Sequence, residues 1–192
     1  MPRVPGKLAA MAVAVGVFAV GGAGIAAGQR DDGGNRGRRG APARTFTAAL
    51  TSYQEVPAVS SRATGSFSAR LDERRGRLFW RLSYRNLDAR VLQAHIHFGQ
   101  KNVNGGVSVF LCSNLLGAPP GTRQCPPAPA TIRGTATAAN VVGPADQGIE
   151  PRAFGELVAA MRAGVTYANV HSEKFPNGET RGQIQPRKQQ RR

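Results

Sequence analysis

The stretch from residue 77 to residue 85, Arg77-Leu-Phe-Trp-Arg-Leu-Ser-Tyr-Arg85, decides the fold class of this chain. Large apolar side chains occupy every even position from 78 to 84, and polar ones occupy the odd positions, with only Phe79 out of phase. A period of two is typical of a β-strand that buries one face and exposes the other. The arginines of this stretch then lie on the opposite face from the core.

The rest of the chain extends this pattern on both sides. Residues 63–71 repeat the alternation, and residues 72–76 supply a hairpin turn between the two strands. A helix is expected from Pro151, a favoured first helical residue, to Gly164. Further strands are expected at 46–51, 91–98, 106–112, 131–139, 165–171 and 179–185. About eight strands and one short helix predict an all-β, antiparallel Greek-key or immunoglobulin-like sandwich or barrel.

Composition supports this class and excludes a helical bundle. The chain has 192 residues, of which 24 are glycine and 13 are proline, and its formal net charge is +15. Much of that charge lies at the two ends, because residues 29–44 hold five arginines and residues 186–192 hold four basic side chains. Arginines on the predicted strands are interpreted as solvated strand faces, with a groove for a polyanion as the alternative.

The first residues are typical of an export signal. Arg3 and Lys7 precede an apolar stretch, 8–27, that ends in small residues. We therefore expect a signal peptide at 1–28, either cleaved or kept as a membrane anchor, and a chain that is secreted or held at the outer face of the cell envelope. The expected organisation continues with a disordered linker at 29–44, a β domain at 45–185 and a disordered basic tail at 186–192.

The two cysteines bracket a loop rich in proline and glycine. Cys112 and Cys125 are 13 residues apart and are the only cysteines of the chain. In an exported protein such a pair predicts one disulfide. A metal-binding or redox pair is the alternative, although the spacing is not that of a Cys-x-x-Cys motif.

The three histidines are the residues most informative about function. His95 and His97 are two apart in Ala94-His-Ile-His-Phe98, so on a strand both side chains project from the same face. His171 follows Asn169 in the same alternation on a later strand. If the two strands are neighbours, three imidazoles converge, and imidazole is a ligand for copper, zinc, iron and nickel. The sequence thus predicts a metal site at His95, His97 and His171.

Two other interpretations of these histidines stay open. They can form a structural hydrogen-bonding cluster, or they can be incidental surface residues. A fourth ligand is not selected by spacing, and four residues are candidates for it: Glu55, Glu173, Glu179 and the Asn169 carbonyl. Glu173 and Glu179 flank an Asn-Gly turn, which favours a turn role over an acid/base pair.

Four stretches resemble the CHRD family, a domain first named from chordin and common in exported bacterial proteins. They begin at Leu50 (LTSYQEVP), Ala94 (AHIHFG), Tyr167 (YANVHS) and Asn177 (NGETRGQI), in the family's order. The resemblance covers about 45–185 and implies an all-β domain described as an immunoglobulin-like barrel. It does not imply a defined activity.

A more distant resemblance is to copper/zinc superoxide dismutase, which is a Greek-key sandwich with a His-x-His strand. It implies copper at the three histidines and places Arg181 where an arginine guides an anionic substrate. The histidine- and aspartate-bearing loop that holds zinc in that enzyme has no counterpart here, and the cysteines are arranged differently.

Three functions follow, in order of preference. The first is an exported binding or structural module that contacts an extracellular or envelope ligand and holds a copper or zinc ion. The second is a copper metalloenzyme of the dismutase kind, although no catalytic motif such as Gly-x-Ser-x-Gly or His-Glu-x-x-His occurs, and the balance is against an enzyme. The third is a polyanion binder that uses the basic ends. No nucleic-acid partner is expected, and a membrane partner only if residues 1–28 are uncleaved.

Overall fold

The computed structural model describes residues 44–187, and these fold as an all-β domain with one α-helix. Three single-turn 3-10 helices occur in the loops: η1 (Ser52–Gln54), η2 (Ala138–Asn140) and η3 (Ala145–Gln147). The helix is α1 (Phe154–Ala163). The strands are β1 (Thr45–Thr51), β2 (Thr64–Asp72), β3 (Arg77–Arg85), β4 (Val91–Phe98), β5 (Gly106–Ser113), β6 (Ala130–Ala136), β7 (Thr166–Ser172) and β8 (Thr180–Arg187). The predicted fold class is confirmed, with every expected strand present.

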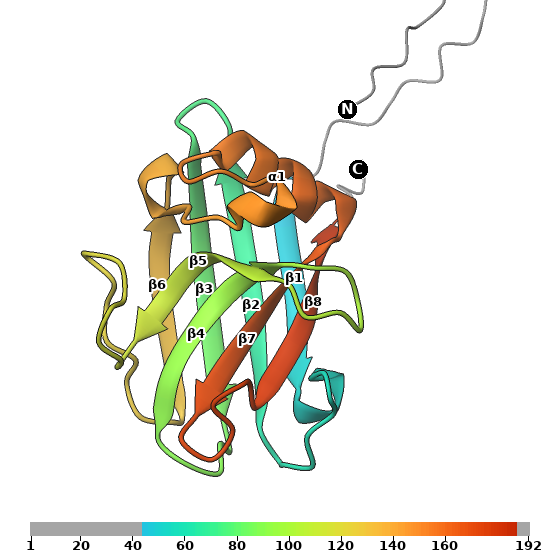
Figure 1. Cartoon of the computed structure of the whole chain (residues 1–192), viewed down its shortest axis with the longest axis vertical. Helices are drawn as coiled ribbons and strands as arrows, with labels where there is room; N and C mark the ends of the chain where they lie inside the picture. Colours follow the sequence, from blue (N-terminus) through green and yellow to red (C-terminus); the bar gives the residue numbers. More distant parts are fainter. Residues whose placement is uncertain (1–43, 188–192) are drawn as a thin grey trace, which may run out of the picture. The chain divides into compact units, whose positions relative to one another are not determined.

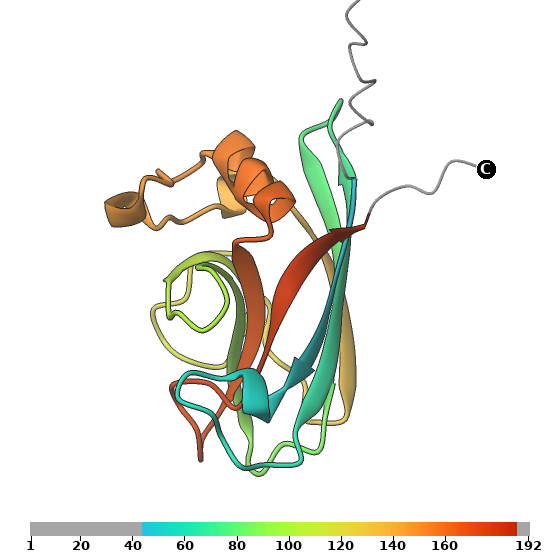
Figure 2. The same ribbon diagram turned by 90° about the vertical axis from the view of Figure 1, so that its right-hand side faces the viewer.

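All strands belong to one antiparallel sheet in the order β5-β4-β7-β8-β1-β2-β3-β6. The sheet curls into an almost closed barrel, so that β4, β5 and β7 lie in front of β1, β2, β3 and β6 (Figure 1). Figure 2 shows the two layers from the side, with β8 passing from one to the other. The two end strands, β5 and β6, do not pair with each other, and we call the gap between them the seam.

The core fills the space between the two layers. Strand alternation places one face of each strand inside, which is why β3 buries residues 78, 80, 82 and 84 and exposes Arg77, Arg81 and Arg85. Helix α1 closes one end of the barrel through Leu157 and Met161, both fully buried. Burial of such side chains provides the main free energy of folding, roughly 25 cal/mol for each Å² of apolar surface removed from water.

Helix α1 ends where the sequence predicts and begins later. Gly164 has a φ of 72°, the left-handed conformation that ends helices. The predicted start at Pro151 is wrong by three residues, because Arg152 has a φ of 73°, outside the helical region. The helix therefore begins at Phe154.

The loop between β5 and β6 is tied to the edge strand β5 by a covalent bond. Cys112 of β5 and Cys125 form a disulfide across 13 residues, as predicted. A hollow of about 190 Å³ lies at the seam, and it is lined by Pro119 and Pro120 together with residues of both edge strands. The loop between the cysteines thus spans the two unpaired edges.

Other predictions fall partly or wholly outside the described residues. The expected signal peptide and nearly all of the linker lie within 1–43, and the tail is described only as far as Arg187, where β8 ends. Among residues 44–187, no helix has both the length and the apolar character that crossing a membrane requires.

Removing the disulfide tests its contribution to the fold. In the chain-entropy view, a crosslink that closes a loop of this size stabilises the folded state by about 3 kcal/mol. We expect the Cys112→Ala/Cys125→Ala variant to lose 2–3 kcal/mol, roughly, in free energy of unfolding, as measured by urea denaturation. The reduced wild-type protein is the matched control and should unfold at a similar urea concentration. Equal stability of oxidised and reduced protein would contradict this account.

Candidate metal centre

The three histidines lie on strands that are neighbours in the sheet. β4 and β7 pair antiparallel, with His95 opposite Asn169 and His97 opposite Tyr167, and His171 follows two residues after Asn169. The residues between them point into the core and are fully buried: Ala94, Ile96, Ala168 and Val170. Because side chains alternate along a strand, the three histidines share the outer face of the sheet. The adjacency on which the predicted site depends is therefore present.

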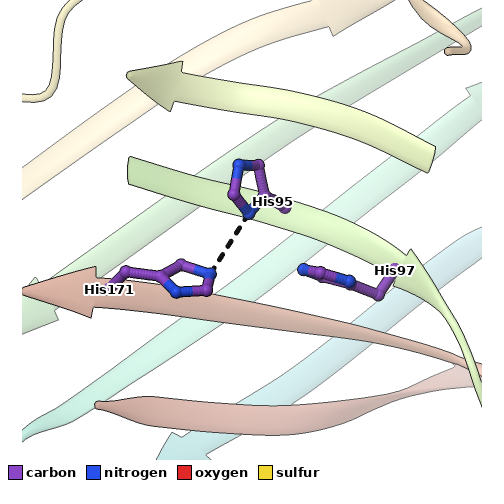
Figure 3. A group of neighbouring side chains, drawn as sticks. All are labelled: His95, His97 and His171. Atoms are coloured by element: carbon purple, nitrogen blue, oxygen red, sulfur yellow. Dashed lines mark hydrogen bonds between the residues drawn. The ribbon is translucent and has the colours of Figure 1, made fainter. Parts of the chain in front are cut away.

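The imidazole rings form a compact triangle (Figure 3). Nδ1 of His95 lies 3.2 Å from Nε2 of His171. The centroid of the His95 ring is 5.3 Å from that of the His97 ring and 5.0 Å from that of the His171 ring. One ring nitrogen from each histidine lies within 4.8 Å of the others. With metal–nitrogen bonds of about 2 Å, three nitrogens this close can reach one ion after small movements.

Backbone carbonyls fix two of the rings. Nδ1 of His97 is 2.9 Å from the Gly105 carbonyl oxygen, and Nδ1 of His171 is 2.9 Å from that of Pro176. A carbonyl only accepts, so each Nδ1 carries the hydrogen and each Nε2 presents a lone pair. A ligand histidine is commonly held in this way, with its second nitrogen donating to a carbonyl. Figure 3 shows the far end of the His97 ring turned toward the other two.

Burial keeps the imidazoles neutral. His95, His97 and His171 are only 2%, 7% and 6% exposed. Loss of hydration, together with the smaller effect of the adjacent His171 and His97 rings, lowers the pKa of His95 to about 2. Loss of hydration also lowers the pKa of His97 to about 4, against the opposing effect of its bond to Gly105. The pKa of His171 is lowered for the same main reason. Neutral imidazole is the form that binds metal ions.

The histidines are buried on an outer face because loops cover them. The loop 99–105 is held over the sheet by Arg181, whose guanidinium donates to the carbonyls of Gln100 and Val103 and to the side-chain oxygen of Asn104. Gln183 adds a bond to the Gly99 carbonyl. The loop that returns from β7 to β8 supplies the carbonyl that binds His171. The site is thus enclosed between the sheet and two loops.

Arg181, Tyr167 and His97 form a continuous stack beneath the loop 99–105. The Arg181 guanidinium carbon lies 3.4 Å from the centre of the Tyr167 ring. The Tyr167 and His97 rings are stacked, 4.7 Å apart and 4° from parallel. Arg181 is only 2% exposed, and its donors bind the loop. The guanidinium therefore holds the loop in place, and it is not open to an anionic substrate as the dismutase resemblance implies.

The four candidates for a further ligand have different surroundings. Glu173 forms an exposed ion pair with Arg90. Glu179 is fully buried and accepts from Ser61 Oγ and the Asp88 backbone N–H, which ties two loops together. Neither carboxylate belongs to the histidine group, which among the described residues contains the three histidines alone.

Glu55 and Asn169 lie closer to the stack. Burial raises the pKa of Glu55 to about 7, while the charge of Arg181 opposes this rise. Asn169 lies directly between His95 and Arg181 in the strand register, and its Oδ1 is buried without a hydrogen-bond partner. Of the four, Asn169 is the one that the register places on the histidine face. Sequence reasoning missed the burial of Glu55 and the stack, although Glu55 lies in one of the quoted motifs.

A comparison of the sequence with known protein families identifies the family of the chain. A family model for the CHRD domain matches residues 46–184. The chain belongs to the CHRD family. The match covers all of the strands except the ends of β1 and β8, and it includes the three histidines of the CHRD domain. No curated protein and no solved structure matches the chain. The distant likeness to superoxide dismutase therefore stays a prediction.

The lowered histidine pKa values predict how the metal-free CHRD domain responds to acid. The unfolded chain takes up protons on histidine below about pH 6.5, whereas the folded chain does not until much lower pH. The contribution of these histidines to the free energy of unfolding is therefore complete at neutral pH, and it is lost as the pH falls below about 6.5. Glu55 acts in the opposite direction, because its raised pKa lets the folded state hold a proton between pH 4.5 and about 7.

Two variants separate these contributions. Urea unfolding with a chelator present should show a falling free energy of unfolding between pH 7 and pH 5. The fall should be steeper in Glu55→Gln, which removes the opposing proton, and shallower in His97→Gln, by roughly one kcal/mol per pH unit in each case. A flat wild-type profile, or three superimposable profiles, would show that these groups are not held as described.

Proposed function

We propose that this CHRD domain is an exported module that binds one copper or zinc ion through His95, His97 and His171. The observation that supports the proposal is the convergence of three neutral, buried imidazoles, two of which are oriented by backbone carbonyls. Such orientation of the rings is what distinguishes a ligand set from a chance cluster of polar side chains.

Unpartnered atoms favour a metal site over a structural cluster. A purely structural cluster should satisfy its buried polar atoms, since each one left unpaired costs about 1–3 kcal/mol. Nε2 of His95 and Nε2 of His97 are both buried without a hydrogen-bond partner, and so is Oδ1 of the neighbouring Asn169. The direct bond between His95 and His171 requires one ring to donate to the other. An ion bound to all three rings would use the His97 nitrogen that the structure leaves unpaired.

The donor set favours copper over zinc. Three neutral nitrogens supply no negative charge, and the group includes no carboxylate or thiolate. A structural zinc site is usually closed by four ligands, whereas nitrogen sites in general bind copper more tightly than zinc. Copper is the ion we expect.

The setting of the module is part of the proposal. An export signal at 1–28 would take the domain outside the cytoplasm, to the envelope or the surrounding medium. The Cys112–Cys125 disulfide agrees with this location, because disulfides persist mainly in oxidising compartments. The module would meet its extracellular or envelope ligand through loops that the barrel holds in place.

Metal analysis tests the proposal directly. Protein purified after exposure to copper should carry one ion per chain, measured by elemental analysis. His97→Gln should weaken copper binding by roughly 100-fold or more in chelator competition, since loss of a direct ligand costs more than the roughly 10–100-fold typical of losing a ligand's hydrogen-bond partner. Tyr167→Phe is the matched control, because it keeps the aromatic stack and all three histidines and should lose less than tenfold. Absence of stoichiometric metal, or equal affinity in His97→Gln, would reject the metal site.

A copper enzyme of the dismutase kind is the second candidate. Three protein nitrogens leave a coordination position open, as catalytic sites require. The burial of the histidines and the engagement of Arg181 argue against easy access for a substrate. Copper-loaded protein should therefore remove superoxide no faster than the same amount of free copper. A rate clearly above that of the free ion, abolished in His97→Gln, would reverse this order of preference.

A further inference from the structure

The outer face of the β2, β3 and β6 layer carries a second feature, unrelated to the histidines. Six exposed arginines lie there or at its margin, and one of them, Arg77, faces Asp72 across β2 and β3. We call the other five the arginine face: Arg70, Arg81, Arg85, Arg123 and Arg133. Figure 2 shows this layer on the opposite side of the barrel from β4 and β5. Among residues 44–187, the ion pairs use other basic side chains, namely Arg44, Arg75, Arg90, Arg162 and Lys174. The arginine face is therefore not neutralised by acidic side chains of the domain.

Two of these arginines face each other across the strands. Arg81 of β3 lies directly opposite Arg133 of β6, and on its other side Arg81 faces Ser68 of β2. Like charges that lie directly opposite each other on neighbouring strands destabilise a sheet. Arg123 adds a third positive charge, because its guanidinium donates to the Arg133 carbonyl. An anion bound between these side chains would relieve the repulsion.

Hydroxyl groups lie beside Arg85, at one end of the arginine face. The hydroxyl oxygens of Ser66 and Ser83 lie 2.8 Å apart across β2 and β3, and Arg85 Nε donates to Thr64 Oγ1. A shallow hollow of about 430 Å³ includes all four of these residues, together with Thr131. Hydroxyls both donate and accept, so this surface can bind the hydroxyl groups of sugars as well as charged groups.

We propose that the arginine face binds a linear polysaccharide whose sugar units carry carboxylates. Guanidinium binds carboxylate through two parallel hydrogen bonds, and the hydroxyl-lined hollow suits the sugar rings. A single-stranded nucleic acid is disfavoured because it needs aromatic rings on which bases can stack. On this face Phe79 is half-buried, and the Arg70 guanidinium lies 5.1 Å above its ring.

Binding to polygalacturonate tests the proposal with the full chain. The Arg81→Ser/Arg133→Ser variant should bind about tenfold more weakly than wild type at equal ionic strength, since it loses two exposed ion pairs. Its affinity should also depend less steeply on salt. The matched control is Arg62→Ser/Arg74→Ser, which removes the same charge from exposed arginines outside the arginine face and should keep wild-type affinity. Dextran, a neutral polysaccharide, should not bind.

Other outcomes would overturn the proposal. Equal losses in the two double variants would mean that net charge alone attracts the polymer. A second comparison uses a chain without residues 188–192 in which Arg30, Arg36, Arg38 and Arg39 are serine. If this chain loses the binding and Arg81→Ser/Arg133→Ser retains it, the basic ends are the binding site. Tighter binding to a single-stranded oligonucleotide than to polygalacturonate, or no binding to polygalacturonate, would also reject the arginine face as a polysaccharide-binding site. Copper affinity should be unchanged in all these variants, so the two proposals fail separately.

Discussion

The antiparallel register between β4 and β7 is the constraint on which the candidate centre depends. It sets His95 opposite Asn169 and places His171 two residues along the same strand face. A shift of one residue would turn the histidines into the core and bring Ala168 and Val170 to the outside, because side chains alternate at every residue. The hydrophobic core therefore fixes the register, and the register fixes the geometry of the three imidazoles. Stability and chemistry are linked through the same pair of strands.

Enclosure of the histidines requires a second layer of polar contacts. Neutral imidazoles are unfavourable to bury unless their nitrogens find partners, and here loop carbonyls provide two of them. Arg181 holds one of these loops, and its own burial is made acceptable by three hydrogen bonds and the face of Tyr167. The motif around Arg181 is thus needed to keep the loop closed over His97. This explains why the centre combines residues from β4, β7 and β8 with loops far apart in the chain.

Strand periodicity allowed much of the fold to be predicted, but not how the strands are ordered. Alternation around Trp80 located β3 and its neighbours, and β4 was predicted with the bounds that the structure has. Nothing local in the sequence specifies that β7 lies beside β4, since that pairing joins segments about 70 residues apart. The three histidines could be proposed as a site from their spacing along the chain. The stack of Arg181 on Tyr167 could not be predicted, because it depends on which strands pair. The start of α1 was missed because Arg152 adopts a conformation that its residue type does not predict.

The unpaired strand edges at the seam affect whether copies of this chain can associate with one another. Unpaired strand edges are templates for sheet extension, and β5 and β6 are the two such edges in this sheet. The loop that joins them carries Pro119 and Pro120 against both edges and is anchored by Cys112 and Cys125. Proline offers no backbone N–H for an incoming strand. A reduced chain would free this loop, so the crosslink protects against edge-to-edge aggregation as well as against unfolding.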